Sequence, residues 1–94
     1  MTVFWSPRAI SHLADLRAYI ARDNPDAAGR VAMALLSAVE RLADLPNLGR
    51  PGRVSGTREL VVSGTRYVIP YRLRGDSLEV IAVFHGRQRW PKRL

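Results

Sequence analysis

The chain has 94 residues, of which 47% are hydrophobic and 24% charged, and it contains no cysteine. This length predicts one domain, residues 1–94, and the lack of thiols excludes disulfides and thiolate zinc sites. No apolar run approaches the roughly 20 residues of a membrane span and no signal-peptide pattern opens the chain, so we expect a cytoplasmic protein without a membrane partner.

The net charge of +7 comes entirely from the second half of the chain. Residues 1–49 carry five arginines and five acidic residues, whereas residues 50–94 carry ten lysines or arginines against three acids. A basic half beside a neutral one predicts a surface that meets an anion, which could be nucleic acid, the ribosome or an acidic protein. The alternative is that these side chains form only a solvated basic face.

Two helices are predicted after a short first strand at residues 3–5. Ser6-Pro7 and Asn24-Pro25 each place a capping side chain before a proline, which is typical of a helix start. Helical spacing of apolar residues predicts a first helix ending near Arg22-Asp23 and a second one that Pro46 stops. The predicted core stripes are Ile10, Leu13, Leu16 or Arg17, and Ile20 in the first helix, and Val31, Leu35, Ala38 or Val39, Leu42 and Leu45 in the second.

The segment 46–56, with two prolines and three glycines, is predicted to be irregular and mobile, and it carries Arg50 and Arg53. Three strands are then expected at residues 57–62, 66–74 and 78–85. The turns between them lie at residues 63–65 and at Gly75-Asp76.

The last strand is apolar on both faces from Val80 to Phe84, which predicts a place inside the sheet. Pro70 cannot donate to a sheet ladder, so either that side of the middle strand is unpaired or a bulge lies there. The order β-α-α-β-β-β predicts an α+β fold in which a two-helix hairpin packs on a mostly antiparallel sheet.

His85 is the first candidate for chemistry, because it ends a buried strand beside Arg87 and Arg89. Histidine moves protons near neutral pH, and neighbouring arginines bind phosphate or stabilise developing negative charge. RNA cleavage would need a second acid or base, for which Glu59 and Tyr67 are the candidates. The structural alternative is a histidine that hydrogen-bonds the backbone at a strand end.

Several arginines lie on the predicted strands and could share a face. Guanidinium groups bind phosphates, and they bind acidic protein segments equally well. Trp90 and Tyr71 could stack on bases, although an aromatic residue near a sheet is more often part of the core. His12 lies within the first predicted helix, next to the apolar stripe, and is expected to be a surface or boundary residue; neither a metal site nor a cofactor is predicted. The predicted anion- or target-binding residues are Arg58, Arg72, Arg74, Arg89 and Trp90.

Six sequence features in order resemble the RelE/ParE superfamily, the toxins of bacterial type II toxin–antitoxin modules. They are the element order, the NP-D-AA start of the second helix, the GRPG loop, GTREL, YVIPYRL and V-x-H-G-R. The resemblance covers nearly the whole chain. It implies a basic toxin that inhibits growth and stabilises plasmids, held silent by a cognate acidic antitoxin whose disordered segment folds as it binds.

The resemblance implies one of two targets. RelE-like members cut messenger RNA on the ribosome, and here His85, Arg87 and Arg66 would be the catalytic residues. ParE-like members inhibit DNA gyrase without cutting nucleic acid. The chain departs from the RelE pattern, because Val68 stands where a strand arginine is expected and no tyrosine follows residue 71. We therefore favour gyrase, with messenger RNA cleavage as the alternative and a non-toxic binding module as a third possibility.

Overall fold

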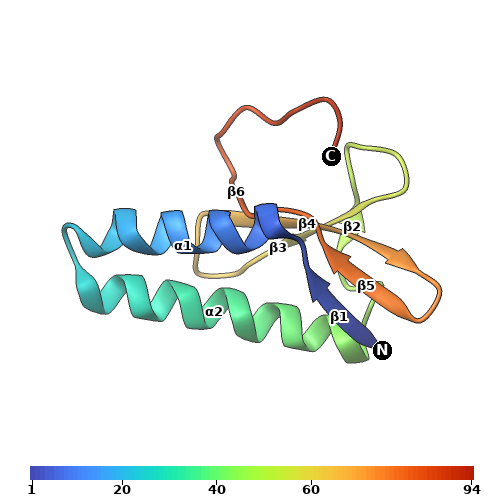
Figure 1. Ribbon diagram of the computed structural model, residues 1–94, viewed down its shortest axis with the longest axis horizontal. Helices are drawn as coiled ribbons and strands as arrows, with labels where there is room; N and C mark the ends of the chain where they lie inside the picture. The colour runs from blue at the N-terminus through green and yellow to red at the C-terminus, as the bar shows by residue number, and fades with distance from the viewer.

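A computed structural model describes residues 1–94 and shows two helices packed on one sheet (Figure 1). The two helices lie side by side and antiparallel, joined by a tight turn at one end of the molecule. The α+β fold and the helical hairpin are confirmed. The elements are β1 Thr2–Trp5, α1 Pro7–Ala21, α2 Pro25–Asp44, β2 Arg50–Pro51, β3 Arg58–Val61, β4 Tyr67–Arg74, β5 Ser77–Val80 and β6 Phe84–His85.

Both helices begin where their capping residues predict. The Ser6 hydroxyl accepts a hydrogen bond from the Ala9 N–H at 3.0 Å, and the Asn24 side chain accepts one from the Ala27 N–H at 3.0 Å. Most of the predicted stripe packs against the sheet, but Ile10 is 57% exposed and Leu45 is 56% exposed, so these two assignments are wrong. Neither helix is both long and apolar enough to cross a membrane.

The sheet has the strand order β1-β5-β4-β3-β2, with β6 also paired to β4. Only β1 and β5 are parallel, and the remaining pairs are antiparallel. The first strand therefore lies at an edge beside β5, which its three residues did not reveal. β5 lies between β1 and β4, inside the sheet, with Leu78 and Val80 fully buried and Ser77 and Glu79 alternating with them.

The predicted continuous strand 78–85 is wrong, because residues 81–83 leave the ladder and divide it into β5 and β6. Tyr71 pairs with Val80, but Val68 pairs with Phe84, so one extra residue lies on the β5–β6 side. The Ile81 N–H donates to the Pro70 carbonyl at 2.9 Å, so the edge of Pro70 that lacks an N–H donor faces this bulge. The two alternatives predicted at Pro70, an unpaired side of the strand and a bulge, are therefore the same feature.

The segment 46–56 also differs from the prediction of an irregular, mobile loop. Arg50 and Pro51 form β2, which pairs with β3. The fully buried Tyr71 fixes the start of this segment, because its hydroxyl accepts from the Gly49 N–H and donates to the Pro46 carbonyl, each at 2.8 Å. Local composition correctly indicated poor helix and strand propensity, but contacts from distant residues order the segment.

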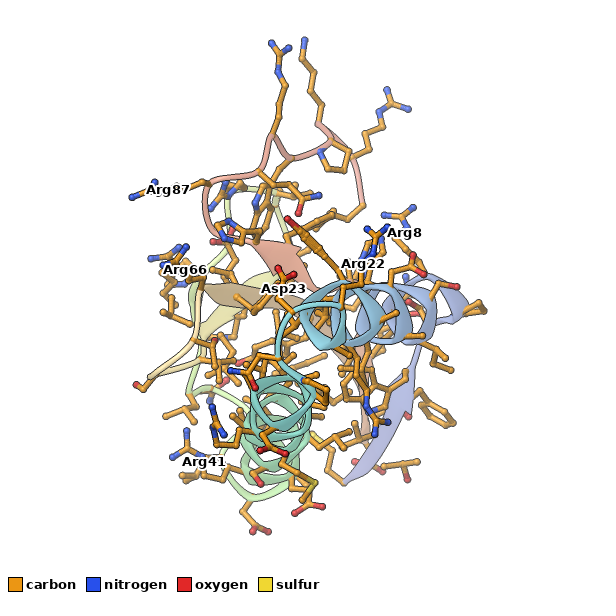
Figure 2. All side chains as sticks on the ribbon, turned by 90° about the vertical axis from the view of Figure 1, so that its left-hand side faces the viewer. Arg8, Arg22, Asp23, Arg41, Arg66 and Arg87 are labelled. Atoms are coloured by element: carbon orange, nitrogen blue, oxygen red, sulfur yellow. The ribbon has the colours of Figure 1, made fainter.

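The sheet is covered on both faces. The main core joins the helices to β3, β4 and β5, and includes Leu35 and Leu42, which are fully buried. A smaller cluster of Ile81, Ala82 and Phe84 is covered by Trp90 and Leu94 of the C-terminal tail, residues 86–94. Figures 1 and 2 show this tail arching over the sheet on the side away from α2. The tail is therefore part of the packed structure.

Candidate functional site

His85 lies at the end of β6 in a tight turn that residues 85–88 stabilise with their own hydrogen bonds. The His85 N–H donates to the Gln88 side-chain oxygen at 2.9 Å, and the Gln88 N–H donates back to the His85 carbonyl at 3.0 Å. The Gly86 N–H donates to the Arg66 carbonyl at 2.7 Å. This turn brings Arg66, His85 and Arg87 together around one surface hollow of about 350 Å³.

The His85 ring is itself part of the turn. Its Nδ1 accepts a hydrogen bond from the Arg87 N–H at 3.1 Å. In the neutral ring this bond places the proton on Nε2, so the free edge of His85 is a hydrogen-bond donor and not a base. The structural alternative for His85, a backbone hydrogen bond at the strand end, is thus what the geometry shows.

Of the two predicted catalytic partners, only Tyr67 lies beside His85. The rings of Tyr67 and His85 meet edge to face, with centroids 5.6 Å apart and planes at 82°. Burial raises the pKa of the Tyr67 hydroxyl, and the nearby Tyr19 adds to this while Arg66 opposes it. Tyr67 therefore stays protonated near neutral pH and cannot serve as the missing base.

Glu59 is committed elsewhere, on the face of the sheet that the C-terminal tail covers. Its side chain is 2% exposed and accepts four hydrogen bonds, two of them from the Arg53 guanidinium and one from Arg50. The fourth comes from the Arg53 backbone N–H at 2.8 Å. Glu59 is therefore a structural anchor for residues 50–53, which were predicted to belong to a mobile loop.

The pH dependence of stability follows from this anchor. Burial by itself raises the pKa of the Glu59 carboxyl, but the hydrogen bonds from Arg53 and Arg50 and the Arg53 charge outweigh burial and lower the pKa below its usual value. A carboxyl with a lowered folded-state pKa stabilises the fold above its unfolded-state pKa, and this contribution is lost as pH falls through the folded-state pKa.

We therefore expect the stability advantage of the wild type over Glu59→Gln to be full at pH 7 and to shrink below about pH 4.5. Urea unfolding of both proteins between pH 7 and pH 3 measures the difference directly. A stability difference that stays constant over this range would show that the Glu59 charge does not contribute.

The other predicted arginines do not form a single cluster with His85. Arg58 and Arg72 line one hollow beside β2, but Arg58 donates to the Gly49 carbonyl at 2.7 Å and Arg72 pairs with Glu79 at 3.2 Å. Arg74 and Arg89 are exposed and form no ion pair within the chain. The basic half therefore presents separate groups of guanidiniums.

Trp90 packs within the small second core. Its ring centroid lies 4.7 Å from that of Phe84, and the Arg53 guanidinium carbon lies 3.6 Å from the ring centre. The ring is thus contacted by a phenyl ring and a cation. These contacts fit a Trp90 that is part of the core better than a Trp90 that stacks on bases. Tyr71 is likewise fully buried.

Tyr19 was not predicted from the sequence as part of this region, whereas His12 was expected to be a surface or boundary residue and is half-buried. Tyr19 is 65% exposed and lines the cleft that contains Tyr67 and His85, and His12 accepts the Val83 N–H at 3.1 Å beside the bulge. An exposed aromatic residue near the end of a helix was the available signal for Tyr19. No group of three or more histidine and acidic side chains is placed to hold a metal ion.

Comparison with known proteins gives concordant results. Residues 3–90 match the family model described as the ParE toxin of the type II toxin–antitoxin system parDE. A putative toxin, Y4kP of Sinorhizobium fredii, is 47% identical over 90 residues, covering 96% of this chain and 93% of the relative. The toxin RelE2 of Caulobacter vibrioides is 36% identical, covering 89% of this chain and 93% of its own length.

A solved structure has the same fold. It belongs to a chromosomal ParDE system of P. aeruginosa and superposes with a TM-score of 0.85 at 22% identity, covering 90% of this chain and 95% of that one. The resemblance to the RelE/ParE superfamily is confirmed by these relatives and by the family match. The chain belongs to the ParE toxin family of type II toxin–antitoxin systems.

Proposed function

We propose that this toxin inhibits bacterial growth by binding its target, with DNA gyrase as the target and no cleavage of nucleic acid. The observation that carries the proposal is the state of His85. Its Nδ1 is occupied by the Arg87 N–H, and no carboxylate lies in the surrounding hollow. A nuclease that activates a 2′-hydroxyl needs a base there, and the hollow offers only donors and cations.

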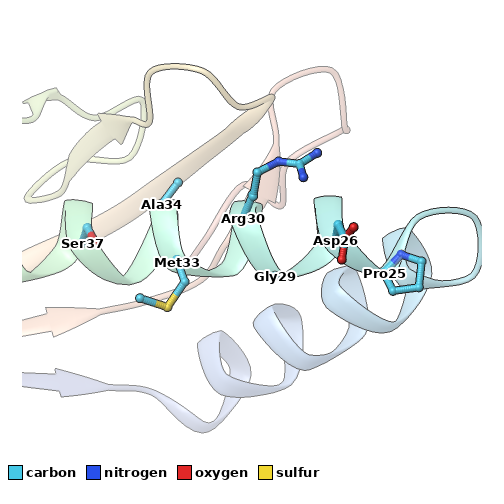
Figure 3. Close-up of a pocket in the computed structure, with 7 residues that line it drawn as sticks. All are labelled: Pro25, Asp26, Gly29, Arg30, Met33, Ala34 and Ser37. Atoms are coloured by element: carbon cyan, nitrogen blue, oxygen red, sulfur yellow. The ribbon is translucent and has the colours of Figure 1, made fainter.

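The proposal includes a cognate acidic antitoxin as the partner that neutralises the toxin in the cytoplasm. The net charge of +7 favours an acidic partner, and Arg66, Arg74, Arg87 and Arg89 have no ion-pair partner within the chain. A second contact is available on the outer face of α2, where Met33 is 62% exposed beside a shallow hollow that begins at Pro25 (Figure 3). An amphipathic antitoxin segment would bury this apolar surface.

Expression in a bacterial host with the antitoxin withheld tests the proposal at the level of the cell. We expect growth to stop with filamentation and DNA damage signalling, because a poisoned gyrase blocks chromosome segregation. Co-expression of the acidic protein encoded beside the toxin should restore growth. Normal growth of cells that accumulate folded toxin would favour a non-toxic binding module.

The second candidate function is ribosome-dependent cleavage of messenger RNA. It is favoured by one observation, that Arg66, His85 and Arg87 surround the same hollow, where they could bind a phosphate. Under this alternative, His85→Ala would abolish codon-linked cuts seen by primer extension on translated message. Under the gyrase proposal we expect no such cuts, and His85→Ala should retain toxicity within about twofold, because inhibition by binding needs no proton transfer and most single truncations at an interface cost little affinity.

A further inference from the structure

A cleft of about 530 Å³ lies where the α1–α2 turn end of the helical hairpin meets the β3–β4 turn. The helices contribute Tyr19, Ile20 and Val31 to its walls, and the sheet contributes Tyr67 and His85. Tyr19 is 65% exposed, and Tyr67, Ile20 and Val31 are each half-buried. The cleft is therefore an apolar recess open to solvent and not a gap within the core.

This cleft continues into the basic hollow around His85, because Arg66 and His85 line both. Figure 2, viewed from the hairpin end, shows Arg66 and Arg87 extending from the same flank of the molecule. The two parts form one groove, which we call the Tyr19–Arg87 groove. It is apolar at the helical end and cationic at the other.

The polar groups of the groove lack partners within the chain. The hydroxyls of Tyr19 and Tyr67 form no intramolecular hydrogen bond, and Arg66 and Arg87 form no ion pair. The free edge of His85 is a donor, as its Nδ1 is already occupied. No acidic side chain lines either part of the groove, so a ligand that complements it supplies hydrogen-bond acceptors with negative charge.

We propose that the Tyr19–Arg87 groove binds an extended segment of the antitoxin that carries an apolar side chain followed closely by a carboxylate. The apolar side chain fills the cleft between Tyr19 and Tyr67, and the carboxylate pairs with Arg66 and Arg87. In an extended peptide, side chains two residues apart lie about 7 Å from each other on one face, so a single short segment spans both parts. This inference rests on the proposed function and assigns a site to the neutralising partner.

A protein segment fits the groove better than nucleic acid does. Ile20, Ala27 and Val31 form an aliphatic wall that offers no hydrogen-bond partner to the polar edges of a base. The Tyr67 ring meets His85 edge to face, which is a packed arrangement and not an open stacking platform. An aliphatic or aromatic protein side chain would bury the same surface without leaving polar groups unpaired.

The test measures binding of the intact acidic protein encoded beside the toxin to four toxin variants by titration calorimetry. Arg66→Gln and Arg74→Gln make the same change in net charge, but only Arg66 lies in the groove. Tyr19→Ala removes the exposed ring, and Tyr19→Phe keeps it. Circular dichroism and thermal unfolding establish that each variant is folded, which is expected because all three positions are exposed.

We expect Arg66→Gln to weaken antitoxin binding by about 10- to 100-fold and Tyr19→Ala by about 10-fold, because each removes a contact made in the bound groove. The two controls, Arg74→Gln and Tyr19→Phe, should stay within about threefold of the wild type, because surface charges outside the contact and a hydroxyl at a solvated edge contribute little.

Several outcomes would contradict antitoxin binding in the groove and leave the proposed function intact. Folded Arg66→Gln and Tyr19→Ala that bind the antitoxin as the wild type does would place the antitoxin elsewhere. Equal weakening of antitoxin binding by Arg66→Gln and Arg74→Gln would show that the affinity depends on net charge and not on the groove. Loss of binding to a single-stranded oligonucleotide, with antitoxin binding unchanged, would assign the groove to nucleic acid. A wild-type toxin that does not bind the antitoxin at all would overturn the proposed function as well.

Discussion

Glu59→Ala is expected to lower the free energy of unfolding by about 3 kcal/mol, because it removes a buried carboxylate that accepts four hydrogen bonds. The substitution also leaves a cavity and an unpaired Arg53 N–H. The effect is at the lower end for a buried ion pair, because the guanidiniums of Arg50 and Arg53 are about half exposed and regain water.

Urea unfolding at pH 7 measures this loss, and Glu79→Ala is the matched control. Glu79 also pairs with one arginine, Arg72, but its side chain is 39% exposed, so its removal should cost less than about 1 kcal/mol. A Glu59→Ala effect as small as that of Glu79→Ala would mean that the Glu59 cluster does not anchor residues 50–53. We also expect faster proteolysis within residues 46–56 of the Glu59 variant.

Gly49→Ala is expected to destabilise the protein by about 3 kcal/mol for a steric reason. A Cβ at this position would lie 2.7 Å from both Cε1 and the hydroxyl of Tyr71 and 2.9 Å from the Glu59 carbonyl oxygen. Tyr71 is fully buried and cannot move aside, so the backbone must shift. That shift also breaks the hydrogen bond from the Gly49 N–H to the Tyr71 hydroxyl.

Gly29→Ala is expected to have the opposite effect and to stabilise the protein. A Cβ at Gly29, inside α2, meets no atom within 4 Å, so the substitution should stabilise the helix by up to about 1 kcal/mol. Thermal unfolding of both variants gives the comparison. If Gly49→Ala were as stable as the wild type, Tyr71 would not hold residues 46–49 in place.

The helices and most strands could be predicted because their signals are local. Ser6-Pro7 and Asn24-Pro25 encode both helix starts within a few residues, and the hydroxyl and amide act as caps in the structure. The limits of the apolar stripes on the two helices could not be predicted in this way, because residues at the edge of an apolar face meet solvent or core depending on the neighbouring layer. Ile10 and Leu45 are exposed for this reason.

The remainder depended on contacts between distant residues. The order in residues 46–56 comes from Tyr71 and Glu59, and the break at residues 81–83 comes from Pro70 on the facing strand. Ser6 and His12 of the first helical region then bind the Ile81 carbonyl and the Val83 N–H. Gly49 and Tyr71 are 22 positions apart and Ser6 and Ile81 are 75 apart, so no local pattern reports these pairs.

The candidate site, too, could be predicted only in part. His85 and Arg87 were expected together at the end of the last strand, and the resemblance added Arg66; the structure places all three around one hollow, with Arg66 joined through the Gly86 N–H. It separates Glu59 and Trp90 from this group and places them on the other face of the sheet. The occupied Nδ1 of His85 depends on the conformation of the turn, which residue types alone do not specify.

Supercoiling of relaxed plasmid by purified DNA gyrase, with toxin added at micromolar concentration, tests the central proposal most directly. We expect the wild type and His85→Ala to inhibit supercoiling to the same extent, because inhibition depends on binding and not on proton transfer at His85. Addition of the antitoxin should restore supercoiling. Full supercoiling in the presence of folded toxin, together with cleavage of translated messenger RNA that His85→Ala abolishes, would contradict this account.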